Sequence, residues 1–160
     1  MRVWICYDAA KGGLMVGAWG GYLRKNGTYS CSHLFARGLL ANEDTTIPKL
    51  ELHSLSTGAN IYLMLDAALE GWLDEMFMAG DSTISLCWTV YENNKLDVFV
   101  RNRVNNVRAK VPLAKLHWVE GPENPADTGT RPDAVSAATV HPTSEWATGK
   151  DWMRMTYEEI

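Results

Sequence analysis

The chain has 160 residues, a formal net charge of −4 at pH 7 and 46% hydrophobic residues. This length predicts one domain with a substantial buried core. The negative charge argues against binding nucleic acid by bulk attraction alone, although divalent metal ions can neutralise a local acidic cluster. No apolar run approaches the roughly 20 residues that span a bilayer, and the first residues lack the apolar region of a signal peptide. We therefore expect no membrane partner.

The cysteines give no sign of a disulfide framework or a zinc site. Cys6, Cys31 and Cys87 are an odd number and lie far apart in the sequence. Reduced intracellular thiols are the simpler interpretation.

The N-terminal part of the chain predicts three antiparallel strands. Residues 2–7 are rich in β-formers and are followed by Asp8. Apolar residues occupy both odd and even positions of this segment. Residues 14–23 and 28–35 predict the next two strands, and the Asn-Gly pair at 26–27 is a hairpin turn signal between them. Apolar residues on both faces of the first strand predict that it lies inside the sheet.

A long helix is expected from about Thr46 to Leu69. Thr45 and Thr46 offer capping hydroxyls, and Pro48 fits a first helical turn. Its predicted apolar surface comprises Ile47, Leu50, Leu52, Leu55, Ala59, Ile61, Leu63 and Leu65. Glu51 is expected in the first turn of this largely apolar helix.

A strand and a helix are expected on either side of Asp81. Residues 72–79 predict the strand, which ends at Gly80. Ser82 and Thr83 can cap the helix, whose apolar residues are Ile84, Leu86, Cys87 and Val90. Asp81 would then lie at the carboxyl end of a strand, where open α/β sheets bind ligands.

The remaining chain predicts one more strand between two helices. After a break at residues 92–95, a helix over 96–110 has Val100, Val104 and Val107 on its inner face. Its other faces carry Arg101, Asn102, Arg103, Asn105, Arg108 and Lys110. Residues 116–119 predict the strand; Asn124 can cap, and Pro125 begin, a short helix containing Asp127. Residues 1–131 are expected to form the catalytic domain, and residues 132–160 a linker and a tryptophan-containing tail that packs on it.

Four acids in this order point to metal chemistry. If the first and fourth strands lie side by side in parallel, the right-handed crossover rule makes Asp8 and Asp81 neighbours. Asp8, Glu51, Asp81 and Asp127 (the four acids) would repel one another when brought together, and Mg²⁺ or Mn²⁺ would relieve that repulsion. Two such ions can activate a water and stabilise a leaving oxygen. Each acid alone is more often a turn, cap or helix-dipole residue, so the set carries the inference.

Five segments in order resemble the motifs of one family. They are Cys-Tyr-Asp-Ala-Ala at 6–10, Thr-Ile-Pro-Lys-Leu-Glu-Leu at 46–52, Gly-Asp-Ser at 80–82, Phe-Val-Arg-Asn-Arg-Val at 99–104, and Trp-Val-Glu-Gly-Pro-Glu-Asn-Pro-Ala-Asp at 118–127. They resemble the ribonuclease H domain of reverse transcriptases from BEL/Pao-type LTR retrotransposons. The tryptophan-containing segment at 145–152 also resembles the one that follows this domain, so the likeness covers nearly the whole chain.

The resemblance implies an α/β fold of the RNase H-like type. The sheet would have five strands, the first three antiparallel and the fourth and fifth parallel, with helices on both faces. It also implies a ribonuclease H that hydrolyses the RNA strand of RNA–DNA hybrids, using two Mg²⁺ ions for which Mn²⁺ can substitute, and leaving 5′-phosphate ends. The partner would be a reverse transcriptase polymerase domain in the parent polyprotein, in the cytoplasm or in virus-like particles.

Roles for individual residues follow from the same resemblance. Asp8, Glu51, Asp81 and Asp127 match the metal-binding catalytic acids. Thr46 stands where related enzymes contact a DNA phosphate. Ser82, Asn124, Arg101 and Arg103 are the other expected substrate contacts; for the two arginines a merely solvated helix face is an equal alternative.

Two departures from the family pattern keep other functions open. Gly121 stands where many cellular relatives have a histidine, and Ile47 where many have an asparagine that reads the minor groove. One alternative is a hybrid- or duplex-binding module with little or no activity. Another is a nuclease of the same fold that acts on DNA or structured RNA.

Overall fold

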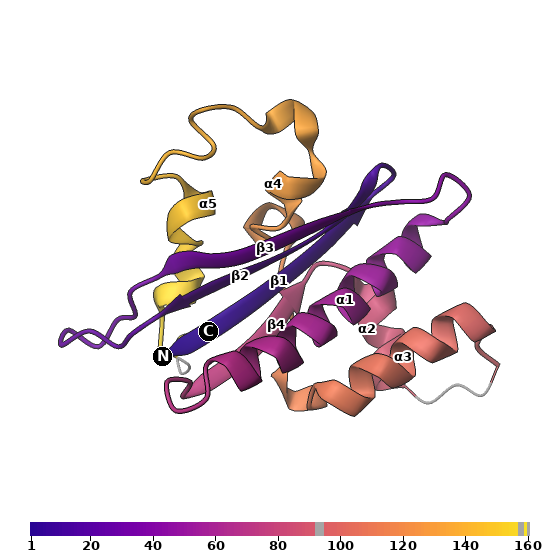
Figure 1. Ribbon diagram of the computed structural model, residues 1–160, viewed down its shortest axis with the longest axis horizontal. Coiled ribbons are helices and arrows are strands. Elements are labelled where there is room, and N and C mark those ends of the chain that lie inside the picture. Colours follow the sequence, from indigo (N-terminus) through magenta and orange to yellow (C-terminus); the bar gives the residue numbers. More distant parts are fainter. Residues whose placement is uncertain (92–94, 157–158, 160) are drawn as a thin grey trace.

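The computed structural model describes residues 1–91, 95–156 and 159. The strands are β1 (Arg2–Ala10), β2 (Gly13–Gly21), β3 (Ser32–Leu40), β4 (Glu75–Gly80) and β5 (Leu116–Trp118). The helices are α1 (Ile47–Ala68), α2 (Thr83–Val90), α3 (Val98–Lys110), α4 (Asp127–Thr130) and α5 (Glu145–Thr148), with short 3₁₀ segments η1 (Leu113–Lys115), η2 (Gly121–Glu123), η3 (Pro132–Ala134) and η4 (Asp151–Arg154) (Figure 1).

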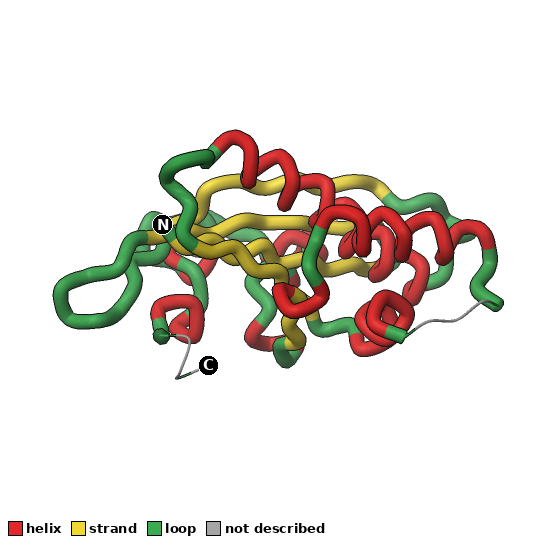
Figure 2. Tube along the Cα trace, turned by 90° about the horizontal axis from the view of Figure 1, so that it is seen from below, coloured by secondary structure: helices red, strands yellow, loops and turns green. Residues whose placement is uncertain are grey.

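The five strands form one mixed sheet in the order β3-β2-β1-β4-β5. Strands β1, β2 and β3 pair antiparallel, whereas β4 is parallel to both β1 and β5. The strands lie between helical segments on both faces of the sheet (Figure 2). This architecture confirms the predicted five-stranded sheet.

Strand β1 divides the hydrophobic core between the two faces of the sheet. Its side chains alternate, so Val3, Ile5 and Tyr7 pack on the face that α1 covers. Trp4 and Cys6 pack on the opposite face, together with buried Met153 of the C-terminal segment. Because both faces are covered, β1 is buried over most of its length, as its apolar sequence predicts.

The hairpin between β2 and β3 is longer than predicted. A turn forms at the Asn-Gly pair, where the Arg24 amide donates to the Thr28 carbonyl at 2.7 Å and Gly27 has φ +85°. The β3 strand nevertheless begins at Ser32 rather than at residue 28. The Ser30 amide donates to the Tyr22 carbonyl at 2.9 Å, but the Tyr22 amide donates to the Ser30 hydroxyl at 2.8 Å, so a side chain replaces one bond of the regular ladder.

The fourth strand also begins later than predicted. It starts at Glu75 instead of residue 72, because the chain first turns at Gly71, which has φ +83°. The Trp72 amide donates to the Leu69 carbonyl at 2.9 Å and Trp72 itself is exposed. A mostly apolar run therefore contains a turn as well as a strand.

Helix α1 buries six of the eight residues of its predicted apolar surface, and small polar residues beside them. Ile47 and Leu63 are exposed, while Ser54, Ser56, Thr57 and Gly58 are buried. A Cβ on Gly58 would lie 2.6 Å from the Met78 side chain, so the helix and the sheet approach closely at this point. Glu51 is the fifth residue of α1 and lies just beyond the first turn, which corrects the predicted position.

The two following helices differ in how well their buried faces were predicted. Helix α3 buries Val100, Val104 and Val107 as expected. Helix α2 buries Ser85 and Thr89 instead of Ile84 and Val90, which are exposed. Burial of Thr89 leaves its hydroxyl paired, because it donates a hydrogen bond to the Ser85 carbonyl at 2.9 Å. The predicted break in the helical pattern covers residues 92–95, and residues 92–94 of it lie outside the described part of the chain.

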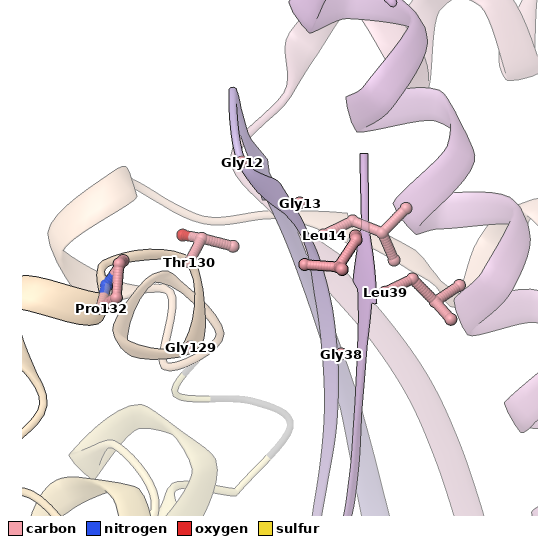
Figure 3. A pocket seen from close by; sticks show the side chains of 9 residues that line it. Gly12, Gly13, Leu14, Gly38, Leu39, Gly129, Thr130 and Pro132 are labelled. Atoms are coloured by element: carbon pink, nitrogen blue, oxygen red, sulfur yellow. The ribbon is translucent and has the colours of Figure 1, made fainter. Parts of the chain in front are cut away.

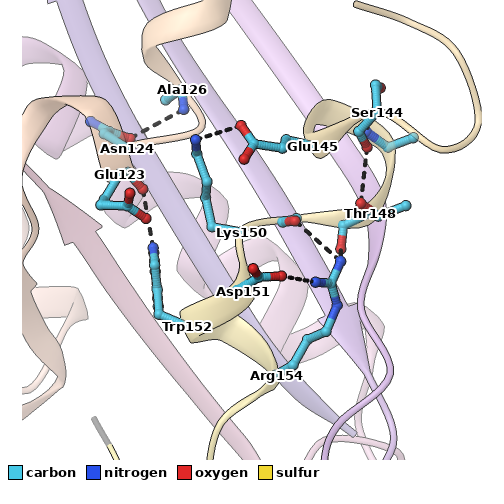
Figure 4. A network of polar contacts seen from close by, with 12 residues as sticks. Glu123, Asn124, Ala126, Ser144, Glu145, Thr148, Lys150, Asp151, Trp152 and Arg154 are labelled. Atoms are coloured by element: carbon cyan, nitrogen blue, oxygen red, sulfur yellow. Dashed lines mark hydrogen bonds and ion pairs between the residues drawn. The ribbon is translucent and has the colours of Figure 1, made fainter.

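The C-terminal segment lies against the face of the sheet opposite α1. Trp152 packs edge-on against Trp4 with ring centres 4.9 Å apart, and its indole N–H donates to the Glu123 carbonyl at 3.1 Å (Figure 4). Trp146 packs in the same way against Trp19 at 5.4 Å. The domain boundary at residue 131 remains a prediction. Among the described residues, no helix combines the length and apolar character needed to cross a membrane.

Candidate functional site

Asp8 and Asp81 lie at the same edge of the sheet because β1 and β4 run in parallel. Cys6 of β1 pairs with Ala79 of β4, and Asp8 and Asp81 each follow two residues later along the chain. Asp8 is only 9% exposed. Burial raises its pKa to about 6, and the negative charges of Asp81 and Asp127 add to this rise, while a hydrogen bond from Thr130 opposes it. Asp8 therefore holds its proton to a higher pH than an ordinary aspartate does.

Asp127 reaches the same edge from the first residue of α4, which packs against β1 and β2. The Thr130 hydroxyl in the last turn of α4 donates to Asp8, so this short helix contributes both a carboxylate and a contact to Asp8. Arg131 follows at once, and its Nε donates to Oδ1 of Asp127 at 2.7 Å. Asp8, Asp81 and Asp127 are called the sheet-edge acids below.

Glu51 is hydrogen-bonded to Ser82, the residue that follows Asp81. The Ser82 hydroxyl donates to Oε2 of Glu51 at 2.7 Å and accepts the Ser85 amide at 3.2 Å. Ser82 thus caps α2, as predicted, and also fixes a carboxylate on α1. The residue immediately before it is Asp81, so Glu51 is connected to the sheet edge through one intervening residue.

Asp81 is surrounded by the segment that follows β5. The Trp118 indole N–H donates to the Asp81 backbone carbonyl at 3.0 Å. The Asn124 amide lies 3.4 Å from Oδ1 of Asp81 and donates to the Tyr7 carbonyl at 2.9 Å. A Cβ on Gly121 would lie 3.2 Å from Oδ2 of Asp81, so a side chain there would press on the carboxylate. Gly121 therefore leaves room for Asp81.

The predicted substrate contacts fall into two groups. Thr46 and Arg101 are exposed; Thr46 is the residue before α1, but its hydroxyl does not cap the helix. Ser82 and Asn124 are 7% and 2% exposed, and both are bonded within the protein, which fits positioning of the acids better than direct contact with a ligand. Asn124 also does not cap α4, which begins at Asp127.

Arg103 is largely engaged within the helical layer. Its guanidinium lies 3.5 Å from the centre of the Phe99 ring and donates to the Phe99 carbonyl at 3.4 Å. Partial burial lowers its pKa. These contacts leave Arg101 as the better exposed of the two arginines for binding a phosphate.

The chemistry of this donor set fits a hard divalent cation. All of its donors are carboxylate oxygens, the kind Mg²⁺ and Mn²⁺ prefer. Burial is the main cause of the raised pKa of Asp8, and the charges of Asp81 and Asp127 add to it; a dication would relieve the part due to these charges. Over residues 1–91, 95–156 and 159, however, no three His, Cys, Asp or Glu side chains converge into a group that could hold a metal ion as they stand. Each acid instead points to a partner of its own, such as Ser82 for Glu51 and Arg131 for Asp127.

Three residues of the site were not predicted from the sequence as part of it. Thr130 and Arg131 lie three and four residues after Asp127, the spacing that returns to the same side of one helical turn. Trp118 lies at the end of β5, next to the end of β4. Helical spacing could have suggested the first two. The Trp118 bond to a backbone carbonyl has no signal in the sequence.

A hollow of about 300 Å³ borders the site on the side of α4. Its lining comprises Gly12, Gly13, Leu14, Gly38, Leu39, Leu40, Gly129, Thr130 and Pro132 (Figure 3). Thr130 both lines this hollow and bonds to Asp8. Thr130 is therefore the contact between this hollow and the sheet-edge acids, none of which is among the lining residues.

Solved structures identify the architecture. RNase H1 from the archaeon Halobacterium salinarum superposes with a TM-score of 0.51 at 18% sequence identity, over 81% of this chain and 94% of that one. The N-terminal RNase H domain of a Mycobacterium tuberculosis protein gives 0.53 at 15% identity, over 83% and 92%. The chain has the RNase H-like fold. At these identities the likeness establishes the fold alone, and neither the models of protein families nor the curated proteins contain a match.

Proposed function

We propose that this protein is a metal-dependent endonuclease that hydrolyses the RNA strand of RNA–DNA hybrids. The observation that carries the proposal is that Asp8, Asp81 and Asp127 lie at one sheet edge, where burial, with a smaller contribution from the charges of Asp81 and Asp127, raises the Asp8 pKa to about 6. The RNase H-like fold and its likeness to two RNase H domains support the choice of reaction. The ordered family motifs in the sequence support the choice of hybrid substrate.

The four acids would hold two Mg²⁺ ions, or Mn²⁺ in their place. Bound ions of this kind supply an activated water and stabilise the leaving oxygen in phosphodiester hydrolysis, giving 5′-phosphate and 3′-hydroxyl ends. The protein's own part is to hold the acids. Ser82 fixes Glu51, and Thr130 fixes Asp8. Trp118 donates to the Asp81 backbone carbonyl. Asn124 donates to the Asp81 carboxylate and to the Tyr7 carbonyl. Thr46 and Arg101, which are exposed, would contact phosphates of the substrate.

The biological setting is part of the same proposal. The motif resemblance supports an origin in a BEL/Pao-type retrotransposon, with a reverse transcriptase polymerase domain as the natural partner. The enzyme would then act in the cytoplasm or in virus-like particles, and the division into residues 1–131 and 132–160 would separate the catalytic unit from its tail.

A substrate panel tests the proposal. The protein is incubated with Mg²⁺ or Mn²⁺ and with end-labelled RNA–DNA hybrid, RNA duplex, DNA duplex, and single strands of each. We expect cleavage of the hybrid on its RNA strand, with 5′-phosphate ends and no product in the presence of EDTA. Cleavage confined to DNA or to structured RNA would instead identify a nuclease of the same fold with another substrate.

A hybrid-binding module without catalysis is the second candidate. The observation that favours it is that, in the described part of the chain, no three acidic, histidine or cysteine side chains form a ready metal site. The discriminating result is tight binding of the hybrid, measured by fluorescence anisotropy, without cleavage in either metal. Cleavage that needs the metal would exclude this candidate.

A further inference from the structure

Arg131 places a positive charge directly on one of the sheet-edge acids. Its Nε lies 2.7 Å from Oδ1 of Asp127, four residues earlier on the same turn. Asp8 and Asp81 also attract this guanidinium, so all three sheet-edge acids act on it. The adjacent Thr130 bonds to Asp8, which holds the end of α4 against the acids.

The other ion pairs between described residues lie outside this site. They join Met1 to Asp74, Lys49 to Asp97, Lys150 to Glu145, and Arg154 to Asp151. Among the ion pairs between described residues, the Arg131–Asp127 pair is thus the one that includes a candidate metal ligand. Two of the four ligands are then committed elsewhere, because Ser82 holds Glu51 in the same way.

We propose that Arg131 is a built-in counter-cation of the site: it neutralises Asp127 in the metal-free protein and must be displaced, at least in part, when a divalent ion binds. This inference rests on the proposed metal-dependent function and names a regulator of its metal affinity. Arg131 would limit charge repulsion before the metal arrives and set the affinity below what the acids alone would give.

The direction and rough size of the effect follow from the charges. A dication bound by Asp127 and a guanidinium that stays nearby repel each other. At separations of about 6 Å in a water-like dielectric this repulsion corresponds to roughly tenfold in affinity, and salt reduces it. The Arg131 side chain is 67% exposed, so it can swing away into solvent and the effect should lie at the lower end, about three- to tenfold.

Metal affinity measured by calorimetry tests this role without relying on activity. Mn²⁺ and Mg²⁺ are titrated into the full chain and into Arg131→Gln, Arg131→Lys and Arg24→Gln. Arg24→Gln is the matched control, because it also removes one exposed positive charge. Arg24 follows the end of β2, which pairs with the start of β1, whereas Asp8 lies near the end of β1. We expect Arg131→Gln to bind Mn²⁺ about three- to tenfold more tightly. Arg131→Lys, which keeps the charge, and Arg24→Gln should stay within about twofold of wild type.

Failure of this inference and failure of the proposed function look different. If wild type binds the metal and Arg131→Gln binds no more tightly, the counter-cation role is overturned while the proposed function stands. If neither wild type nor Arg131→Gln binds either metal, the proposed function itself is overturned and the counter-cation role with it. An equal gain in Arg24→Gln would show a general charge effect and would also overturn the specific role of Arg131.

Discussion

The hydroxyl of Ser82 donates a hydrogen bond of 2.7 Å to Oε2 of Glu51. This bond joins the start of α2 to α1 and places a carboxylate beside the segment that contains Asp81. Ser82 also accepts the Ser85 amide and so caps α2. One buried side chain therefore links the fold of the helical layer to the arrangement of the acids.

Replacing Ser82 by alanine should harm both stability and metal binding. Loss of the cap is expected to lower the free energy of unfolding by about 1 kcal/mol. Loss of the bond to Glu51 should weaken Mg²⁺ binding several-fold. Ser82→Thr keeps a hydroxyl and a capping oxygen and is the matched control. Urea unfolding and calorimetric titration measure the two effects; unchanged metal affinity in Ser82→Ala would contradict the role assigned to the bond.

Asp8 should make the metal-free protein less stable as the pH rises. Its pKa is about 6 in the folded protein and 3.8 in its ordinary state, so the folded state holds more protons between these values. Stability should therefore fall through this window and stay lower above pH 6. The two-unit shift corresponds to about 2–3 kcal/mol relative to Asp8→Asn. Thermal melting in EDTA from pH 4 to 8 measures it.

The control for that experiment is Asp133→Asn, which removes an exposed carboxylate outside the site. It should follow wild type across the same pH range. If the melting temperatures of wild type and of Asp8→Asn changed with pH in the same way, the charge of Asp8 would not be the cause of the loss of stability.

Gly80 is expected to be essential for packing next to Asp81. A Cβ at this position would lie 2.3 Å from the ring of Tyr7, which is buried and cannot yield easily. Gly80→Ala should therefore cost about 1–3 kcal/mol of stability. Gly12→Ala is the control, since a Cβ there meets no atom within 4 Å. Equal unfolding midpoints for the two variants would refute the close approach.

Trp118 should support the reaction without being needed for folding. Its ring is 51% exposed, and its N–H donates to the Asp81 carbonyl. Trp118→Phe keeps most of the ring and removes the donor, which should lower kcat about two- to tenfold with little change in Tm. Trp72→Phe, at another exposed tryptophan, should leave kcat unchanged. A similar loss in both variants would contradict a specific role for Trp118.

The architecture of the sheet could be predicted because its signals are local and strong. The apolar first strand, the Asn-Gly turn and the glycine before Asp81 indicate the strands, and the crossover rule makes the first and fourth plausible neighbours; the five-stranded arrangement follows from the family resemblance. The starts of β3 and β4 could not be predicted in the same way. They depend on the Ser30 hydroxyl replacing a ladder bond and on a turn at Gly71 that runs into an apolar segment, and the apolar pattern shows neither.

The site was harder to predict than the fold. The sequence supplies the four acids, but their individual partners arise from segments far apart in the chain, such as Ser82 with Glu51 and Thr130 with Asp8. The buried face of α2 was mistaken for a similar reason. Ser85 and Thr89 can be buried because their hydroxyls bond to backbone carbonyls within the helix, which hydrophobicity alone does not reveal.

The four acids are proposed to serve one metal-dependent cleavage reaction. The most direct test is the cleavage rate of an RNA–DNA hybrid in Mg²⁺ and in Mn²⁺ for wild type and for Asp81→Asn, both checked for folding by circular dichroism. We predict cutting of the RNA strand by wild type and a loss of at least about a hundredfold in the variant. Equal rates, or no cutting by folded wild type in either metal, would contradict the account.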